Sequence, residues 1–540
     1  MQSDAPPPIV QRVLPFLLLV LSCAATPPER AFDEAEAIAH GTDQERVRDL
    51  YRAAAQRDPD PLRREHAAIR AAHLEWRVFR NAAAARELLA PFDTTDAHGE
   101  RARIELELAH DLPAARAAVE RAQAAAKTNI DRRKALVPAA YLAFEEKRYR
   151  DTIAIAERVI AGVGPRTQSA RLLLRAAIHA NDDATALRAF RWYYADVPQL
   201  VPASVANRQE LGRALAKARL YQEASLILDD PEIDAYAAAL KRIEQLVDDH
   251  YRKAATGDES QRAFVKAVKK ELPKDAASRF GAVTTFGETD GVSGMHFGHR
   301  VLDERRTVEQ YGRRGSIRFI LLDNMIANGF MAWILDGRSG AGGWAEKETV
   351  YQVRPMYANG PINAWLALTD PEQRAKKDRE IADETRRDAE RIKTAPVVAL
   401  PGLSLRMERQ YLEALRASAH TRDAFIARYR QEEFDHSIWA HEGRHSIDQT
   451  QFGIDDSEEL EYRAKLSEIA FAASPRLALT GAILTNVGGD TPHGKANQRV
   501  LEGMARVTKV KLNALDSLSD EQLRNAARAL DPLAKAQAGS

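Results

Sequence analysis

The sequence predicts a mainly α protein in which an array of short helices precedes a smaller α+β region. Alanine, arginine, leucine and glutamate, which favour helices, are abundant among the 540 residues. Short amphipathic segments separated by polar breaks run from about residue 30 to about residue 270, and glycine, aromatic and β-branched residues become more frequent near Phe280. We therefore predict a leader (1–22), a helical domain (23–270), an α+β domain (271–515) and a C-terminal tail (516–540).

The charge of the chain is balanced, with 78 basic and 78 acidic side chains. Proteins that bind nucleic acid through its phosphates usually carry an excess of positive charge. This composition gives no such indication, and we expect no nucleic acid partner.

An apolar run at residues 13–21 follows Arg12 and is too short to span a bilayer comfortably. It ends in Val20-Leu21-Ser22-Cys23, which resembles the lipobox of bacterial lipoproteins. The resemblance implies cleavage before Cys23, acylation of Cys23 and a lipid anchor in the cell envelope. Ala24 in place of an aspartate implies sorting to the outer membrane, facing the periplasm. The alternatives are an ordinary signal peptide with an incidental cysteine, or a short anchor.

Two segments of the helical region match at a spacing of 34 residues: Lys147 to Ile153, and Asn181 to Leu187. This period resembles that of tetratricopeptide repeats, in a degenerate form. The resemblance implies an α-solenoid, whose concave surface would bind a protein partner. The alternative is a rigid spacer or a packing support for the second domain.

The C-terminal half contains two β-rich segments, residues 318–322 and 349–353. A long helix with interleaved acids and bases then begins at Asp370-Pro371, and its solvated face indicates a helical hairpin or a lid. Residues 410–430 predict a further helix directly before the motif described next.

The motif His441-Glu442-Gly443-Arg444-His445 carries the chemistry of the sequence. Histidines four residues apart lie on one face of a helix, so both imidazoles can bind one metal ion while Glu442 acts as a base beside it. A catalytic zinc needs a third protein ligand, for which Glu461 and Glu468 are the candidates. The alternative is an ordinary helix with polar side chains, which the charge of Arg444 and the flexibility of Gly443 favour.

The motif and a glutamate on a following helix resemble the gluzincin class of zinc metallopeptidases. More narrowly, Glu461-Tyr462-Arg463-Ala464 resembles the Glu-(Phe/Tyr)-x-Ala-Asp motif of the prenyl-protein and heat-shock membrane endopeptidases. The resemblance implies a zincin-like α+β domain, Zn²⁺ bound by His441, His445 and Glu461, and an edge strand, here residues 349–357, that pairs with substrate. Lys465 replaces the aspartate that braces a histidine ligand in that motif. Glu468 is therefore either the brace or the third ligand, and residues 349–357 are alternatively an internal strand.

His493 lies in a glycine-rich polar segment, residues 486–497. It is a candidate donor to the oxyanion of a tetrahedral intermediate. The alternative is a helix-capping turn with an exposed histidine. His296 and His299 are weaker candidates of the same kind.

These features together predict a zinc-dependent endopeptidase of the bacterial cell envelope, with Glu442 activating the attacking water and a protein or peptide as substrate. Two other functions fit the same sequence. One is a non-catalytic envelope lipoprotein whose repeats are an interaction scaffold. The other is a metal-dependent hydrolase of cell-wall amide bonds.

Overall fold

The computed structural model describes residues 28–39, 43–253, 258–289, 292–323, 333–334, 343–346, 349–354, 359–395 and 397–538. The chain divides into two compact units, Met1–Ala126 and Lys127–Ser540. The candidate site lies in the second. The predicted boundary at residue 270 stays a prediction, and the helices between residues 127 and 270 belong to the same compact unit as the candidate site.

The first unit is helical in its described part. Its helices are α2 (Pro28–Ile38), α3 (Gln44–Arg57), α4 (Pro61–Arg77), α5 (Ala82–Leu89), α6 (Thr95–Arg103), the π-helix η1 (Ile104–Ala109) and α7 (Leu112–Ala124). Asp43, Asp60 and Asn81 cap three of them by accepting backbone N–H groups of the first turn. Trp76, Leu89 and Ile104 are buried where α4, α5 and α6 meet. Helix propensity, capping and a small apolar core therefore agree in this unit.

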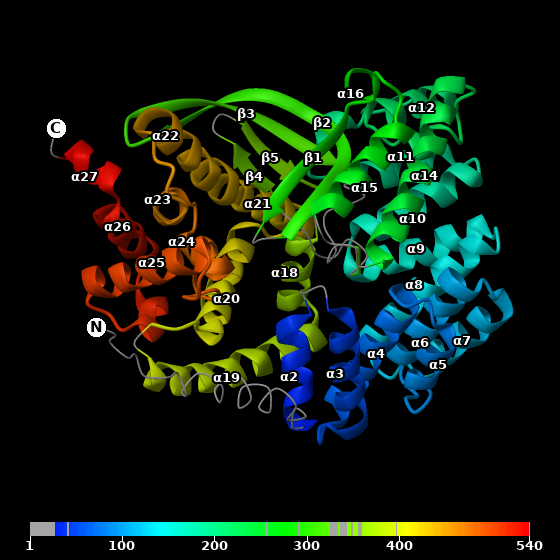
Figure 1. Ribbon diagram of the computed structural model, residues 1–540, viewed down its shortest axis with the longest axis horizontal. Helices are drawn as coiled ribbons and strands as arrows, with labels where there is room; N and C mark the ends of the chain where they lie inside the picture. The colour runs from blue at the N-terminus through cyan, green and yellow to red at the C-terminus, as the bar shows by residue number, and fades with distance from the viewer. Residues whose placement is uncertain are drawn as a thin grey trace, which may run out of the picture. The chain divides into compact units, whose positions relative to one another are not determined.

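The second unit begins with further helices and then forms a sheet (Figure 1). The helices are α8 (Asn129–Glu145), α9 (Tyr149–Val163), α10 (Thr167–His179), α11 (Asp183–Tyr193), η2 (Pro198–Leu200), α12 (Arg208–Lys217), α13 (Tyr221–Ala224), α14 (Pro231–Arg252), α15 (Asp258–Glu271) and α16 (Ala276–Arg279). Helices α9 and α11 start 34 residues apart, which is the spacing noted in the sequence.

One turn conformation recurs between consecutive helices in both units. In each case a residue with positive φ stands two positions before the next helix, and the N–H that follows it bonds a carbonyl five or six residues back. This closes the last turn of the preceding helix. The residues are Arg80, His110, Lys147, Asn181 and Arg219. The repeat signal in the sequence thus corresponds to a repeated helix–turn–helix geometry.

The sheet has five strands in the order β1-β2-β3-β5-β4. They are β1 (Ala282–Thr289), β2 (Val292–Gln310), β3 (Arg313–Asp323), β4 (Gly343–Glu346) and β5 (Thr349–Val353). Strands β3 and β5 are parallel and the other neighbours antiparallel. The predicted strands 318–322 and 349–353 are confirmed. The prediction of an edge strand at 349–357 is wrong for β5, because β5 lies between β3 and β4; residues 355–357 lie outside the described part.

From residue 360 to residue 538, the described part of the second unit is helical. Its helices are α18 (Gly360–Thr369), α19 (Pro371–Thr394), α20 (Pro401–Ser418), α21 (Arg422–Phe434), η3 (Asp435–Glu442), α22 (Gly443–Phe452), α23 (Ser457–Phe471), α24 (Pro475–Ala478), η4 (Leu479–Ile483), α25 (Pro492–Thr508), η5 (Leu512–Ser517), α26 (Asp520–Leu530) and α27 (Pro532–Ala538). The charged helix α19 forms a hairpin with α20, held by ion pairs such as Lys377 with Glu408 (3.2 Å) and Arg409 with Asp378 (2.8 Å). The prediction of a mainly α fold with a small sheet is confirmed.

The segment predicted as a C-terminal tail belongs to the core. Helix α26 buries Leu523, Ala527 and Leu530 in an apolar cluster with residues of α20, α23 and α25. In the described part of the chain, no helix combines the length and the apolarity that crossing a bilayer requires.

Helices η3 and α22, which carry the metal-binding motif, pack directly on the sheet. Ile438 and Ile447 share an apolar core with Ile317 and Phe319 of β3. At Gly443 an added Cβ would lie 2.8 Å from a methyl group of Val308 in β2. The glycine that weakens this helix in isolation is therefore the residue that lets it approach the strand.

Candidate metal centre

The metal-binding motif lies on one continuous helical stretch, residues 422–452, that changes pitch within the motif. Helix α21 passes into the π-helix η3, which ends at Glu442, and α22 continues from Gly443. The N–H of Gly443 bonds the carbonyl of Ile438, five residues back, which is the π-helical pattern. Wide turns of this kind occur often at functional sites, because they re-aim side chains.

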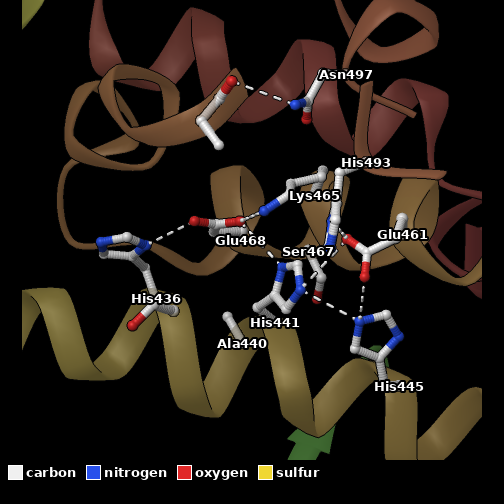
Figure 2. A network of polar contacts seen from close by, with 12 residues as sticks. His436, Ala440, His441, His445, Glu461, Lys465, Ser467, Glu468, His493 and Asn497 are labelled. Atoms are coloured by element: carbon white, nitrogen blue, oxygen red, sulfur yellow. Dashed lines mark hydrogen bonds and ion pairs between the residues drawn. The ribbon is translucent and has the colours of Figure 1, made fainter. Parts of the chain in front are cut away.

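Three side chains converge on one point (Figure 2). The Nε2 atoms of His441 and His445 are 3.2 Å apart. Glu461, from α23, reaches both imidazoles: its Oε1 is 3.3 Å from Nε2 of His445, and its Oε2 is 3.6 Å from Nε2 of His441. All three side chains are buried or nearly so.

This donor set fits a zinc ion in chemistry and in size. Two imidazole nitrogens and one carboxylate are a usual ligand set for catalytic zinc. Ligands about 2.0–2.1 Å from a tetrahedral zinc are about 3.3–3.4 Å from one another. The separation of the two Nε2 atoms, 3.2 Å, lies close to this value. Glu461 offers a different oxygen to each imidazole, Oε1 at 3.3 Å from His445 and Oε2 at 3.6 Å from His441, so its carboxylate lies beside both nitrogens that such an ion would share.

Glu468 lies behind His441 and faces its other ring nitrogen. The Nδ1 of His441 donates to Oε2 of Glu468 at 3.1 Å, and Nδ1 of His436 donates to Oε1 at 3.0 Å. Lys465 also donates to Oε2, at 3.2 Å. A carboxylate in this position fixes the tautomer that leaves Nε2 free for a metal. Of the two predicted roles, the geometry of Glu468 matches the brace, and that of Glu461 matches the ligand.

Electrostatics keep both carboxylates ionised. Burial works against ionisation of Glu461, but hydrogen bonds from His445 and His493 hold its pKa well below the ordinary value. Burial likewise opposes ionisation of Glu468, and the charge of Lys465 with the imidazoles of His436 and His441 lowers its pKa. Deprotonated carboxylates are the form that binds and braces a metal.

Glu442 completes the motif. Its carboxylate belongs with His441 and His445 to a group whose ligand atoms lie within 4.8 Å of one another. Burial lowers the proton affinity of His445, but Glu461 and Glu442 more than offset this, so the pKa of His445 is raised in the metal-free protein. Glu442 is half-buried, so its carboxylate is close to the two imidazoles and still reaches solvent.

His493 is brought to the same group from α25. Thr491 caps that helix, and Asn497 donates to the carbonyl of Asn486 at 2.8 Å, which closes the glycine-rich segment. The Nδ1 of His493 lies 2.8 Å from Oε2 of Glu461, and the side chain is 47% exposed. The segment is therefore both a capping turn, as one prediction held, and a support that places His493 beside the candidate ligand.

The charge of Arg444 has a structural partner. Its side chain is fully buried and donates to Asp448 at 2.8 Å and to both oxygens of Asp531 at 2.8 and 2.9 Å. Asp531 follows α26, in the segment predicted as a tail. Arg444 thus ties the motif helix to the C-terminal end of the fold.

Other predicted residues lie elsewhere. His299 is a core histidine, 2% exposed, in contact with Tyr236 at 2.9 Å. The side chain of His296 and the whole of Cys23 lie outside the described part. Sequence reasoning missed His436, because its contact with Glu468 depends on the π-helical turn. Its spacing of five residues from His441 gives no signal by itself, because in an α-helix the two side chains would point about 140° away from each other.

The chain matches no protein-family model, no curated protein and no solved structure. The functional argument therefore depends on the geometry of this site.

Proposed function

We propose that this chain is a zinc-dependent peptidase whose metal is held by His441, His445 and Glu461. The observation that carries the proposal is the convergence of two Nε2 atoms and one carboxylate at 3.2–3.6 Å from one another, with Glu468 bracing the first histidine. Polar side chains that only satisfy one another's hydrogen bonds do not require two imidazole nitrogens and a carboxylate to face one point while a second carboxylate orients one of the histidines.

Each residue has a distinct task in the proposed reaction. A zinc ion bound here would supply Lewis-acid polarisation of the peptide carbonyl and bring the pKa of a coordinated water to around 7. Glu442 takes up the proton of the attacking water and returns it to the leaving amine. His493 lies half-exposed beside Glu461, and because its Nδ1 donates to Glu461, it gives a hydrogen bond to the oxyanion through Nε2 as the doubly protonated imidazolium.

The finer fold assignment belongs to the same proposal. The sheet beside the motif helix, with Glu461 on the following helix α23, supports a zincin-like domain of the gluzincin type. The repeated helix–turn–helix geometry supports a tetratricopeptide-like solenoid that binds a protein partner. The lipobox-like sequence at Cys23 supports a lipid-anchored protein of the bacterial cell envelope, at the outer membrane and facing the periplasm.

The non-catalytic scaffold is the weaker proposal. Its evidence in the sequence was the charge of Arg444 and Lys465 within the motifs. Both charges have buried carboxylate partners: Arg444 pairs with Asp531, and Lys465 pairs with Glu468, which in this proposal is the brace and not a ligand. A hydrolase of cell-wall amide bonds uses the same site, and a screen of peptides against peptidoglycan fragments separates the two substrates.

The decisive experiment replaces Glu442 with glutamine in the full-length chain. We expect Glu442→Gln to retain one zinc per chain and to lose about 10²–10⁴-fold in the rate of peptide hydrolysis, which is the usual contribution of a general base. Glu413→Gln, the same change at an exposed position of α20, is the matched control and should hydrolyse normally. Normal turnover by Glu442→Gln, or a parent protein that takes up no zinc, would refute the proposal.

A further inference from the structure

One buried imidazole close to the candidate metal centre has no task in the proposed reaction. His436 is 6% exposed and lies in η3, five residues before His441. In an α-helix, side chains five residues apart point about 140° away from each other. The π-helical turn removes most of this rotation, because its hydrogen bonds span five residues. Both histidines therefore face Glu468 (Figure 2).

The hydrogen bonds of His436 assign its tautomer. Glu468 is ionised, so its oxygens only accept, and the Nδ1 of His436 must carry the proton in the 3.0 Å bond to Oε1. The Nε2 of His436 is buried and has no hydrogen-bond partner within the described part of the chain. The bond from Nδ1 to Glu468 is therefore the hydrogen bond that the imidazole of His436 makes within the described residues.

The two oxygens of Glu468 are held from different sides. His441 and Lys465 both donate to Oε2, at 3.1 and 3.2 Å. In the described part of the protein, the contact recorded at Oε1 is that of His436. Donors on both oxygens fix the plane of the carboxylate. Without His436, Oε1 stays buried without a partner and the carboxylate is free to rotate away from His441.

We propose that His436 is a positioning residue of the metal centre: it holds Glu468 in the orientation that aims Nε2 of His441 at the metal. This inference rests on the proposed zinc site. It assigns no contact between His436 and the metal or the substrate. The residue acts through Glu468 and then through His441, a chain of two hydrogen bonds of 3.0 and 3.1 Å.

The test compares three substitutions that differ in where they place a donor. The amide nitrogen of asparagine, attached at Cγ, occupies nearly the place of the imidazole Nδ1, whereas that of glutamine lies one atom further out and phenylalanine has no donor. We expect His436→Phe and His436→Gln to bind Zn²⁺ roughly 10–100-fold more weakly than the parent, as loss of such outer partners typically does. His436→Asn should lose less than about tenfold, below that range.

Zinc affinity is measured on the full-length chain by competition with a chromophoric chelator, and Co²⁺ is then substituted to record the visible spectrum of the site. The spectrum of His436→Asn should match that of the parent, while His436→Gln should alter it. Unfolding of the metal-free variants in urea shows whether the fold is kept, and the comparison of asparagine with glutamine remains valid if His436→Phe does not fold. Equal affinities for asparagine and glutamine would overturn the positioning role and leave the zinc peptidase intact. A parent without zinc would overturn both.

Discussion

Glu461 and Glu468 lie seven residues apart on one face of α23, and the structure gives them different tasks that affinity measurements can separate. Glu461 contacts the Nε2 atoms that would share a metal with it. Its replacement by glutamine removes the only negative charge among the three ligands, and we expect zinc affinity to fall more than about 100-fold, beyond the range found for outer partners.

Glu468→Gln acts by a different route. Three donors surround the carboxylate: His436 at Oε1, and His441 and Lys465 at Oε2. A glutamine has one acceptor oxygen, so its NH₂ group must face at least one of these donors. We expect a loss of about 10–100-fold in zinc affinity, which corresponds to about 1.4–2.8 kcal/mol.

Chelator competition with the full-length chain at pH 7 measures both variants on one scale, and Glu413→Gln is again the control for the chemical change. The order of the two effects is what matters. If Glu468→Gln abolished zinc binding while Glu461→Gln kept it within tenfold of the parent, Glu468 would be the third ligand and the assignment would be refuted.

Two further predictions concern the fold around the site. Arg444→Met leaves Asp531 buried without its cation and Asp448 with Arg463 alone, 3.6 Å away, and should cost about 3–5 kcal/mol in the free energy of unfolding. Arg386→Met, at a position 75% exposed, should cost no more than about 0.5 kcal/mol, and equal urea midpoints for the two variants would contradict this. Burial lowers the pKa of His299 to about 3, so the unfolded chain takes up a proton below pH 6.5 that the folded chain does not. Stability from this group is complete above pH 6.5 and falls as the pH drops toward 3, by up to about 2 kcal/mol at pH 5. In urea unfolding, His299→Gln should lose less stability than the parent between pH 7 and pH 5. If the parent and the variant lost the same free energy of unfolding over this range, the buried neutral imidazole would be refuted.

The candidate site was predictable from the sequence where the chemistry depends on spacing along one helix. The four-residue interval between His441 and His445 places both histidines on one face of a helix, whether its turns are α-helical or the slightly wider π-helical turns. The acidic helix that follows in the sequence contains Glu461. The sequence does not distinguish the brace from the third ligand, because two carboxylates two turns apart differ only in how far α23 is shifted along the motif helix. That shift is a property of tertiary packing and leaves no local signal.

Tertiary packing also explains the other differences between the sequence-based predictions and the structure. Residues 349–353 were recognisable as a strand from their β-branched and aromatic side chains, but their place inside the sheet depends on β4, which is four residues long. Arg444 seemed to disfavour a functional helix because its partner Asp531 lies 87 residues away in the sequence. From the neighbouring sequence alone, a charged residue such as Arg444 is expected to face solvent. Its carboxylate partner, Asp531, is brought beside it only by the fold.

A residue that belongs to neither α23 nor the motif helix forms hydrogen bonds to both. Gln310, at the end of β2 and 2% exposed, donates to the carbonyl of Ala440 at 2.8 Å and accepts from the hydroxyl of Ser467 at 2.6 Å. Ala440 immediately precedes His441, and Ser467 immediately precedes Glu468. The amide of Gln310 therefore joins the backbone next to His441 to the side chain next to Glu468, through its NH₂ group on one side and its oxygen on the other. Because the sheet carries Gln310, the packing of the motif helix on β2 and β3 fixes the hydrogen bond between His441 and Glu468 as well.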